Sequence, residues 1–319
     1  MALSTSEAEA LIPQFRLERL LNQDQAGRRI SLLGSIQSKP AILIAERAAF
    51  SIQANHLENF NASVSNVQNL GANDIYFWFL ARAASDSNSS NQPADLKLNL
   101  IHPCTEKHIK KYSQQGIRLV SETPEIYKDH VRPYIEKQRG EGRLDWIFNI
   151  IEGRTEQEDV FYREHGEEGF LVLPDLNWDR KTMTSLHLLG LVERRDIWSV
   201  RDLQKRHVTW LKHMREKLLE ATVKLYPELE KDQLKLYVHY QPTYHHFHIH
   251  IVHVALEAGA TQATGKALGL ENVISQVENM AGTESAGMAD VSLTYTIGEA
   301  SELWTDIFQP LKSCLSVES

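Results

Sequence analysis

The chain contains little cysteine and no excess of positive charge. Of its 319 residues only two, Cys104 and Cys314, are cysteines, and neither a CxxC pair nor a zinc-finger spacing of Cys and His occurs. This usage favours reduced thiols inside a cell over a disulfide scaffold. Acidic residues outnumber basic residues by 42 to 34, which gives a formal net charge of −8. Because long duplex nucleic acid requires a basic footprint, we expect no such partner.

Long apolar runs are absent as well. No window approaches the roughly 18 uninterrupted apolar residues of a membrane span. Glu7 and Glu9 stand where a secretory signal would be basic. We therefore expect a protein of the cytosol or nucleus, without a membrane partner. Hydrophobic residues make up 42% and charged residues 24% of the chain, as is typical of a folded globular protein.

The order of expected helices and strands indicates an α+β protein of two domains. Helices and antiparallel hairpins are mixed without a βαβ rhythm, and we find no internal repeat. The charged segment 136–143 contains two glycines and no apolar residue, so we place the domain boundary there. The smaller N-terminal domain would cover 1–138 and the C-terminal domain 139–319. A Ser- and Asn-rich stretch at 84–95 is expected to be an exposed loop within one hairpin.

Apolar periodicity predicts the individual elements. Residues 1–23 are typical of a short amphipathic helix, residues 183–195 of an apolar-striped helix, and Ser199 begins a long helix with a capping-box pattern. The other expected elements are strands at 40–50, 74–82, 96–102, 169–176, 234–242, 245–254 and 291–298, and helices at 105–112, 144–153 and 267–280.

The histidines are concentrated in one segment. Six of the fourteen lie between residues 239 and 253, and three of these alternate with apolar residues in the order His246, Phe247, His248, Ile249, His250, Ile251. Because successive side chains of a strand point to opposite faces, three imidazoles line one face and three apolar side chains pack on the other. A turn around Pro242 and Thr243 would fold the preceding strand back and place His239 near His246.

The spacing alone leaves three interpretations open. The first is chance placement on a solvated strand face. The second is a zinc site, since His at i and i+2 on a strand is a known ligand geometry and His239 could be a third ligand. The third is nucleophilic catalysis, in which a central imidazole attacks phosphorus and water cleaves the nucleotidyl-histidine. An unperturbed pKa near 6.5 leaves one imidazole nitrogen free for such an attack at neutral pH.

This motif resembles that of the histidine triad superfamily, whose members act on nucleotide phosphates. The similarity extends to the scavenger mRNA decapping branch over five segments, 73–76, 105–112, 146–150, 173–176 and 236–250. The resemblance implies hydrolysis of residual 7-methylguanosine cap dinucleotide, or of short capped RNA, to 7-methylguanosine monophosphate during mRNA decay. It implies that no metal or other cofactor is needed. It also implies a homodimer whose N-terminal domains exchange between protomers and close over one active site at a time.

The resemblance also assigns roles to individual residues. His248 is the implied nucleophile, and His246, His250 and His239 would orient it and stabilise charge. Trp146 and Leu176 would sandwich the methylated base, whose cationic ring favours an aromatic face. The remaining implied substrate contacts are Glu156, Asp175 and Pro174 at the base, Lys111 and Lys266 at the phosphates, Asn73 and Tyr76 from the N-terminal domain, and Asn177, Thr243 and Tyr244.

One position departs from the family pattern. The family usually carries a lysine where this chain has Asn177. The loss of that charge would weaken cap binding and leave the nucleophile untouched. Two alternative functions remain, a general dinucleoside polyphosphate hydrolase of the same superfamily and a cap-binding or regulatory protein that no longer hydrolyses. Without the resemblance, Trp146 would be interpreted as a core residue and Lys111 and Lys266 as surface charges.

Overall fold

The computed structural model describes residues 9–315, apart from 25–28, 74, 84–93, 143, 176, 177, 257 and 258. Within these residues the fold is α+β, as expected, with antiparallel sheets and several helices. No helix in the described part of the chain is long and apolar enough to cross a membrane. The chain divides into two compact units, one of residues 45–115 and one of residues 1–44 together with 116–319.

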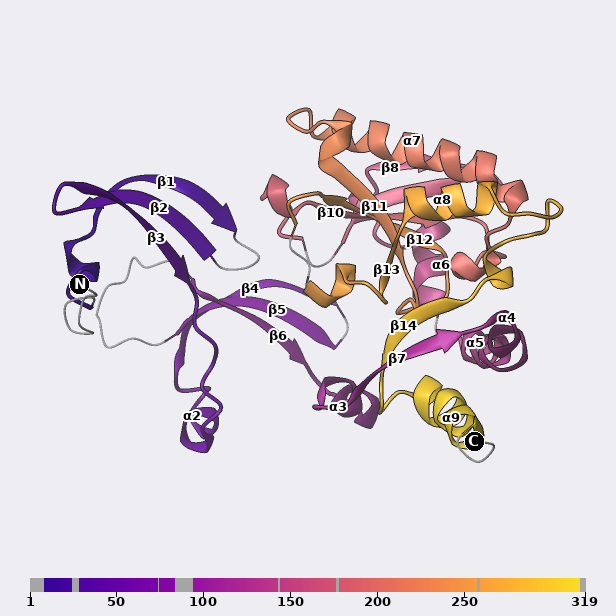
Figure 1. Cartoon of the computed structure of the whole chain (residues 1–319), viewed down its shortest axis with the longest axis horizontal. Coiled ribbons are helices and arrows are strands. Elements are labelled where there is room, and N and C mark those ends of the chain that lie inside the picture. The colour runs from indigo at the N-terminus through magenta and orange to yellow at the C-terminus, as the bar shows by residue number, and fades with distance from the viewer. Residues whose placement is uncertain are drawn as a thin grey trace. The chain divides into compact units, whose positions relative to one another are not determined.

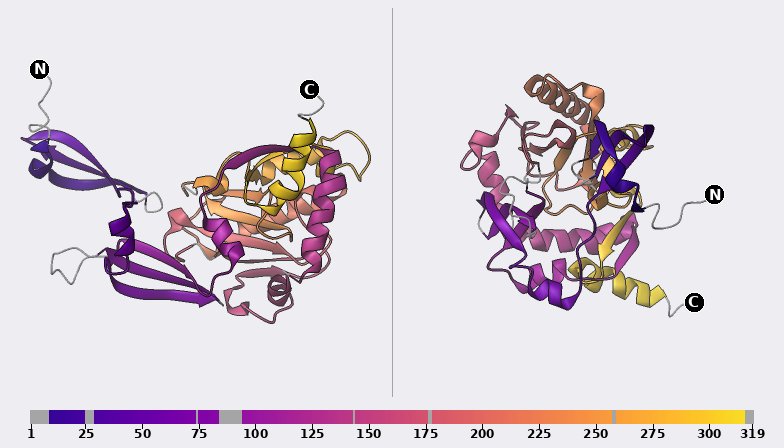
Figure 2. Two further views of the ribbon diagram at one scale, coloured as in Figure 1. Left: turned by 90° about the horizontal axis from the view of Figure 1, so that it is seen from below. Right: turned by 90° about the vertical axis from the view of Figure 1, so that its left-hand side faces the viewer.

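The unit of residues 45–115 is built on a three-stranded antiparallel sheet (Figure 2). Its elements are α2 (Ala54–Glu58), β4 (Val64–Asn73), β5 (Tyr76–Ala83), β6 (Leu96–Ile101) and α3 (Glu106–Tyr112). The expected hairpin is confirmed, because β5 pairs with β6 from Tyr76 opposite Ile101 to Ala81 opposite Leu96. The predicted loop of this hairpin falls mostly at 84–93, outside the described residues. Helix α3 begins after Thr105, in agreement with the helix expected over 105–112.

The segment that begins the other unit forms a sheet instead of the expected helix. Strand β1 (Arg16–Asp24) pairs with β2 (Arg29–Ile36), which in turn pairs with β3 (Lys39–Glu46). Leu17, Leu20 and Leu21 have a helical spacing, so the prediction of a helix over residues 1–23 is wrong for the described strand. Pairing with β2 overrides this local pattern, since tertiary context outweighs intrinsic propensity.

A six-stranded antiparallel sheet carries the histidines. Its strand order is β13-β11-β12-β10-β9-β8, and the strands are β8 (Tyr162–Glu164), β9 (Phe170–Pro174), β10 (His187–Val192), β11 (Leu234–His239), β12 (His248–His253) and β13 (Ala267–Gly269). Strand β10 lies where a helix over residues 183–195 was expected, and that prediction is wrong. The strand is central and nearly fully buried, so its run is apolar on both faces, and periodicity cannot separate such a strand from a buried helix.

Different α-helices cover the two faces of this sheet. On one face α7 (Val208–Leu225) and α8 (Leu270–Glu278) lie side by side (Figure 1). They pack on the main core, which includes Phe247, Ile249 and Ile251. The opposite face carries α6 (Asp145–Ile151), whose isoleucines pack against leucines of β9 and β10 in a smaller cluster. The expected division of β12 into an apolar and a histidine face is thus confirmed.

The remaining elements complete the larger unit. Strand β7 (Ile117–Glu122) pairs with β14 (Leu293–Gly298), and a continuous helical segment follows from α4 (Pro124–Ile126) through a π-helical turn into α5 (Arg132–Gly140). A second π-helical turn leads into α9 (Gln309–Leu315). The segment 127–135 contributes Val131 and Ile135 to the main core. The domain boundary at 138/139 stays a prediction.

One helix begins later than its capping signal indicates. Ser199 accepts a hydrogen bond from the backbone of Arg201 and caps only a 3-10 turn, because Leu203 is extended. Helix α7 starts at Val208, after a second short turn. The expected start of the long helix at Ser199 is therefore wrong, although the cap itself is present.

Candidate active site

The central histidines lie on β12 and face the side of the sheet that α6 covers. His248 is opposite Leu191 of β10, and His250 is opposite Leu189. Directly opposed residues of paired strands share a face, and both leucines belong to the cluster under α6 or pack against it. His248 and His250 are almost fully buried, with 5% and 6% of their surfaces exposed. The alternation seen in the sequence therefore places them beside α6.

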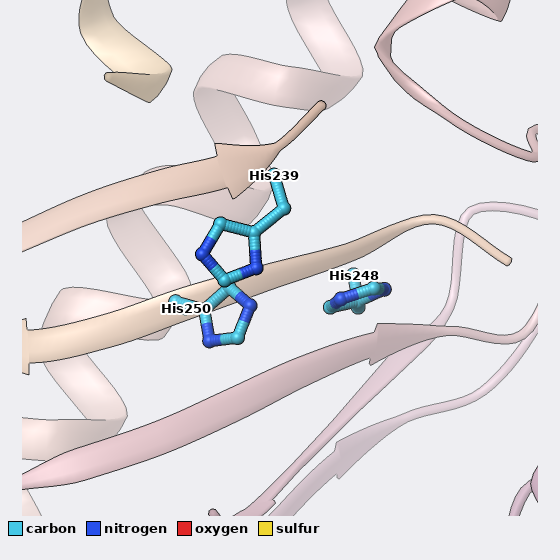
Figure 3. Close-up of side chains that lie close together, drawn as sticks. All are labelled: His239, His248 and His250. Atoms are coloured by element: carbon cyan, nitrogen blue, oxygen red, sulfur yellow. The ribbon is translucent and has the colours of Figure 1, made fainter. Parts of the chain in front are cut away.

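His239 lies beside His248 and His250, and the expectation that it lies near His246 is wrong. Tyr237 of β11 is opposite His250, so the antiparallel register carries His239 to the level of His248. The rings of His239 and His250 are 4.3 Å apart between centroids (Figure 3). His246 precedes β12, and its Nε2 donates to the carbonyl of Val192 over 2.7 Å. The loop 240–247 keeps it out of the β11–β12 ladder.

The tautomer of His248 follows from its backbone contact. Its Nδ1 lies 2.8 Å from the carbonyl oxygen of His246. A carbonyl oxygen only accepts, so Nδ1 carries the proton and donates it. In the neutral ring Nε2 therefore has a lone pair. His248 has the form that a nucleophile needs, with one nitrogen anchored and the other available.

Burial keeps this group of imidazoles neutral. It lowers the pKa of His239, His246 and His248 to about 4, and it also lowers the pKa of His250. Desolvation disfavours the charged form of an imidazole. The positive charge of Lys266 acts in the same direction on His239 and His250. At neutral pH these rings are uncharged and can offer lone pairs.

Aromatic rings connect the nucleophile to the base-binding residue implied by the sequence. Tyr244 stacks on His248 with ring centroids 4.2 Å apart, and Trp146 of α6 meets Tyr244 edge-on at 5.2 Å. Trp146 is 48% exposed, so the interpretation of this residue as core is wrong. The structure thus places an exposed indole next to a tyrosine that covers the nucleophile, with Thr243 exposed on the same loop.

Lys266 lies against the loop that precedes β12. Its Nζ donates to the carbonyl oxygen of Gln241 over 2.6 Å. The side chain of Gln241 donates to the buried carboxylate of Glu122 at 3.2 Å and lies 3.1 Å from His245. His245 belongs to this loop, and its contact with Gln241 joins two parts of the loop. Lys266 is therefore held at the edge of the histidine cluster.

A buried ion pair contacts this loop, and no sequence pattern predicted it. Arg201 and Glu122 are both inaccessible to solvent and lie 2.7 Å apart. The same carboxylate accepts hydrogen bonds from Tyr240 and, over 2.6 Å, from Tyr295. Arg201 also donates to the carbonyl of Met288. A charge buried this deeply is tolerated only when it is paired and hydrogen-bonded.

The two carboxylates implied to bind the base, those of Asp175 and Glu156, lie in different local structures. Asp175 directly follows β9, next to the buried Pro174, and its backbone N–H donates to the carbonyl of His187. Glu156 begins the turn at 157–159 with a positive φ of 55°. Burial, reinforced by Asp159, raises the pKa of the Glu156 carboxyl. Proximity of Glu156 to Trp146 remains a prediction.

Some implied residues cannot be placed in this site. Leu176 and Asn177 lie outside the described residues, as do the side chains of Asn73 and Lys111. Tyr76 belongs to the unit of residues 45–115, where its hydroxyl is 3.3 Å from Nε2 of His108. The parts that these residues play in substrate binding remain predictions.

Two residues of the histidine face were missed by the sequence reasoning. Tyr237 stacks on His250 at 4.8 Å, nearly parallel, and His187 of β10 lies 2.9 Å from Nδ1 of His250 through its Nε2. Tyr237 could have been found, because it is two residues before His239 and shares its face on a strand. His187 carries no such signal, since it was assigned to a helix.

Within the part of the chain that the structure describes, two groups of side chains could hold a cation. His239, His248 and His250 bring ligand atoms within 4.8 Å of one another, and so do Asp175, His187 and His250. Neutral imidazoles are suitable ligands for zinc. The donor set is thus compatible with a metal.

A wide groove lies elsewhere in this unit, away from the histidines of β12. It has a volume of about 1020 Å³ and is lined by residues that include Arg163, Glu193 and Arg195. None of the histidines of β12 lines it, and its arginines are paired with carboxylates, such as Arg163 with Glu193 at 3.1 Å. This groove is therefore not part of the histidine site.

Comparisons with known proteins agree with this geometry. Residues 10–115 match the family model described as scavenger mRNA decapping enzyme (DcpS) N-terminal, and residues 145–265 match scavenger mRNA decapping enzyme C-term binding. The chain is 36% identical over 312 residues to the m7GpppX diphosphatase of Schizosaccharomyces pombe, with 98% of each chain covered.

More distant relatives bear the same name. The Caenorhabditis elegans m7GpppX diphosphatase is 33% identical over 270 residues, or 82% of each chain, and that of Homo sapiens is 29% identical over 252 residues, 76% of this chain and 72% of the human one. The similarity covers both the histidine-bearing part and the N-terminal part, and on these grounds the chain belongs to the scavenger mRNA decapping enzyme family.

Proposed function

We propose that this protein is a scavenger decapping pyrophosphatase, which hydrolyses residual 7-methylguanosine cap dinucleotide or short capped RNA in mRNA decay. The observation that carries the proposal is the free Nε2 of His248, beside an aromatic residue exposed for a base. The relatives are m7GpppX diphosphatases, which supports the same substrate class. The product would be 7-methylguanosine monophosphate.

The first chemical step is attack of His248 on the phosphate attached to 7-methylguanosine. A bond forms between Nε2 and phosphorus, and the anhydride bond to the bridging oxygen breaks. The electron pair of that bond leaves with the diphosphate end of the second nucleotide. Water then attacks the nucleotidyl-histidine, loses its proton to solvent, and restores the neutral imidazole. The hydrogen bond from Nδ1 to the His246 carbonyl holds the ring through both steps.

Side chains around His248 would meet the charge of the phosphates. Lys266 is held at the edge of the cluster by Gln241, and His250 adjoins the nucleophile. His239 also lies beside the nucleophile, but its Nε2 already donates to the carbonyl oxygen of Thr261 over 2.8 Å, so it positions the cluster and does not donate to phosphate. Donors positioned before the reaction stabilise charge that develops in the transition state. No metal is required for this arrangement, so we propose metal-independent hydrolysis.

Base recognition is proposed to involve Trp146 and the carboxylates of Asp175 and Glu156. A methylated guanine is cationic, and a cation over an indole face gains about 0.5–2 kcal/mol. Hydrogen bonds that involve a charged partner contribute roughly 1.5–3 kcal/mol each. Leu176 directly follows Asp175 in the sequence and would close the other side of the base. Together these contacts would favour methylated over unmethylated caps.

A homodimer is proposed as the functional assembly. Apolar side chains are exposed on the N-terminal sheet, among them Leu17, Ile42 and Ile44. Several exposed apolar side chains on one sheet are typical of an interaction surface, and a second copy of this chain is the proposed partner. Light scattering after size exclusion should give twice the mass of 36.4 kDa. A monomer at micromolar concentration would contradict this part of the proposal.

The proposed site of action is the cytosol, with or without the nucleus. A fluorescent fusion, imaged in living cells and checked for activity after purification, tests this localisation. Signal confined to a membrane-bounded secretory compartment would contradict it.

One digest tests the function. Purified protein is incubated with methylated and unmethylated cap dinucleotide, with and without EDTA, and the products are separated by chromatography. We expect 7-methylguanosine monophosphate from the methylated cap, much slower cleavage of the unmethylated cap, and no effect of EDTA. Equal rates would instead indicate a general dinucleoside polyphosphate hydrolase, tight binding without product a cap-binding protein, and loss of activity with EDTA a metal enzyme.

A further inference from the structure

His187 is a buried histidine that the proposed chemistry does not use, yet it contacts the cluster directly. It is the first residue of β10, between Asp175 at the end of β9 and His250 on β12. Its Nε2 is 2.9 Å from Nδ1 of His250 and 3.8 Å from Oδ2 of Asp175. The side chains of His187 and Asp175 are only 13% and 12% exposed. The three residues form a row across three neighbouring strands.

One proton lies between Nε2 of His187 and Nδ1 of His250, and either nitrogen can carry it. Burial lowers the pKa of both residues, so both rings are neutral at pH 7. A hydrogen bond between two neutral imidazoles needs one donor and one acceptor. Either Nε2–H of His187 donates to Nδ1 of His250, or Nδ1–H of His250 donates to Nε2 of His187. The two arrangements give His250 opposite tautomers.

The carboxylate of Asp175 selects between these arrangements. At 3.8 Å it is too far from Nε2 of His187 for a hydrogen bond, but a charge at this distance in a half-buried site still acts strongly. An N–H dipole directed from Nε2 is attracted to the carboxylate, whereas a lone pair on the same nitrogen is repelled by it. The proton is therefore favoured on Nε2 of His187, and Nδ1 of His250 accepts.

We propose that His187 is a positioning residue that fixes the tautomer of His250, so that His250 presents an Nε2–H donor to the phosphate undergoing attack. This inference rests on the proposed function. Nε2 of His250 is buried and has no hydrogen-bond partner among the described residues. A nonbridging or leaving oxygen would accept from it. Without His187, a proton could move to Nδ1, and Nε2 would turn a lone pair toward the anionic phosphate.

Among the described residues, the other contacts of the His250 ring are stacking and packing contacts. Tyr237 lies nearly parallel to it at 4.8 Å between centroids, which fixes the plane of the ring. The plane does not decide which nitrogen carries the proton. The polar contact with His187 therefore distinguishes the two nitrogens of His250.

Two substitutions at residue 187 separate hydrogen bonding from packing. His187→Leu removes the donor and retains an apolar filling, whereas His187→Gln places an amide N–H near the position of Nε2. We expect His187→Leu to lower kcat by roughly 10- to 100-fold with KM changed less than about threefold, because partners that orient a functional histidine have effects of this size. His187→Gln should recover most of kcat. His213→Leu is the matched control, since His213 is half-exposed and pairs with Glu164.

A spectroscopic measurement reports the tautomer without turnover. Long-range ¹H–¹⁵N correlation spectra of ¹⁵N-histidine-labelled full-length protein distinguish Nδ1–H from Nε2–H, and His250→Gln assigns the signal. We expect the Nε2–H form of His250 in the wild type and in His187→Gln, and an increased Nδ1–H form in His187→Leu.

These experiments test the role of His187 independently of the proposed decapping activity. An unchanged tautomer in His187→Leu, or equal loss of kcat in His187→Leu and His187→Gln, would overturn the inference. A chain that cleaves no cap but shows the expected tautomers would overturn the proposed function and leave the His187–His250 contact intact. Cap binding measured in a His248→Asn background should be unaffected by His187→Leu.

Discussion

The segment 247–251, which leads into and forms most of β12, has an apolar face and a histidine face with different roles. On one face Phe247, Ile249 and Ile251 are buried in the main core under α7 and α8. On the other face His248 and His250 are buried just as deeply beside the smaller cluster under α6. Burial of the apolar side chains stabilises the fold, whereas burial of the imidazoles lowers their pKa and keeps their lone pairs available.

The comparison teaches that side chains buried to the same extent can contribute differently to the free energy of folding. Ring nitrogens of His246 and His250 are buried without a hydrogen-bond partner among the described residues. Such groups cost free energy in the folded state. Burial of the apolar face must therefore offset the cost of the histidine face. Substitutions on the two faces should separate activity from stability.

The largest effect is expected for His248→Asn. Asparagine can still donate toward the His246 carbonyl, but it has no ring nitrogen to attack phosphorus. Release of 7-methylguanosine monophosphate in single-turnover assays should fall by at least about 10⁴-fold, as when a catalytic nucleophile is removed. The Tm should stay within a few degrees of the wild type. Retained cleavage would show that another residue is the nucleophile.

Arg201→Met should cause the largest loss of unfolding free energy among the proposed substitutions. It leaves the carboxylate of Glu122 buried without its charge partner, and breaking a buried pair in this way costs about 3–5 kcal/mol. Urea denaturation measures the loss of unfolding free energy. Adding Glu122→Gln to Arg201→Met removes the unpaired charge and should recover part of it. If the single variant were as stable as the wild type, the pair would be dispensable.

Ile249→Ala tests the apolar face between the two histidines. The side chain is fully buried, and such truncations cost about 2–5 kcal/mol. The variant should unfold at lower urea concentration, yet its kcat at 20 °C should remain within a few-fold of the wild-type value. A fall in kcat as large as that of His248→Asn, in a protein that is still folded, would mean that the faces are not separable.

The pH dependence distinguishes a buried from an exposed nucleophile. Burial lowers the pKa of His248 to about 4, so protonation removes its lone pair only near that pH. An imidazole of ordinary pKa near 6.5 would lose about tenfold in reactivity between pH 7 and pH 5.5. We expect kcat/KM to change little over this interval and to fall only near pH 4. Circular dichroism must show folded protein at each pH, and an acid limb near 6.5 would contradict the prediction.

The same pKa shifts predict a loss of stability in acid. The folded-state pKa of His239, His246 and His248 lies below the unfolded value. Between about pH 6.5 and pH 4 the unfolded chain therefore binds more protons than the native protein, and the free energy of unfolding decreases as pH falls. Above pH 7 these histidines are neutral in both states and contribute no pH dependence.

Trp146→Leu should have the smallest effect. The indole is half-exposed, so its loss changes stability little. Removal of a cation–π contact worth about 0.5–2 kcal/mol should weaken binding of methylated cap by about 2- to 30-fold. Calorimetry with the His248→Asn variant avoids turnover during the measurement, and binding of unmethylated cap should change less. Equal weakening for both caps would assign Trp146 to packing.

Local patterns predicted the parts of the fold that depend on neighbouring residues. The alternation of His248, Ile249 and His250 gave the two faces of β12, because strand geometry has a period of two. The hairpin of β5 and β6 and the cap of α3 at Thr105 also follow from local sequence. These features need no knowledge of the rest of the chain.

Other features depend on which strands become neighbours. Residues 187–192 are apolar in a way that fits a helix or a central strand, and only their place between β9 and β12 decides for a strand. The position of His239 depends on the register with β12 and on the length of the loop between them. The exposure of Trp146 depends on how α6 lies over the sheet.

The sequence by itself determined that His248 and His250 would share a strand face, together with the family to which the chain belongs. Only the tertiary structure decided which groups set the protons and charges of those imidazoles. The His246 carbonyl fixes the tautomer of His248, His187 contacts His250, and the Gln241 carbonyl holds Lys266. Side-chain periodicity is a property of one strand, whereas hydrogen-bond partners and desolvation come from strands and loops that are distant in the chain.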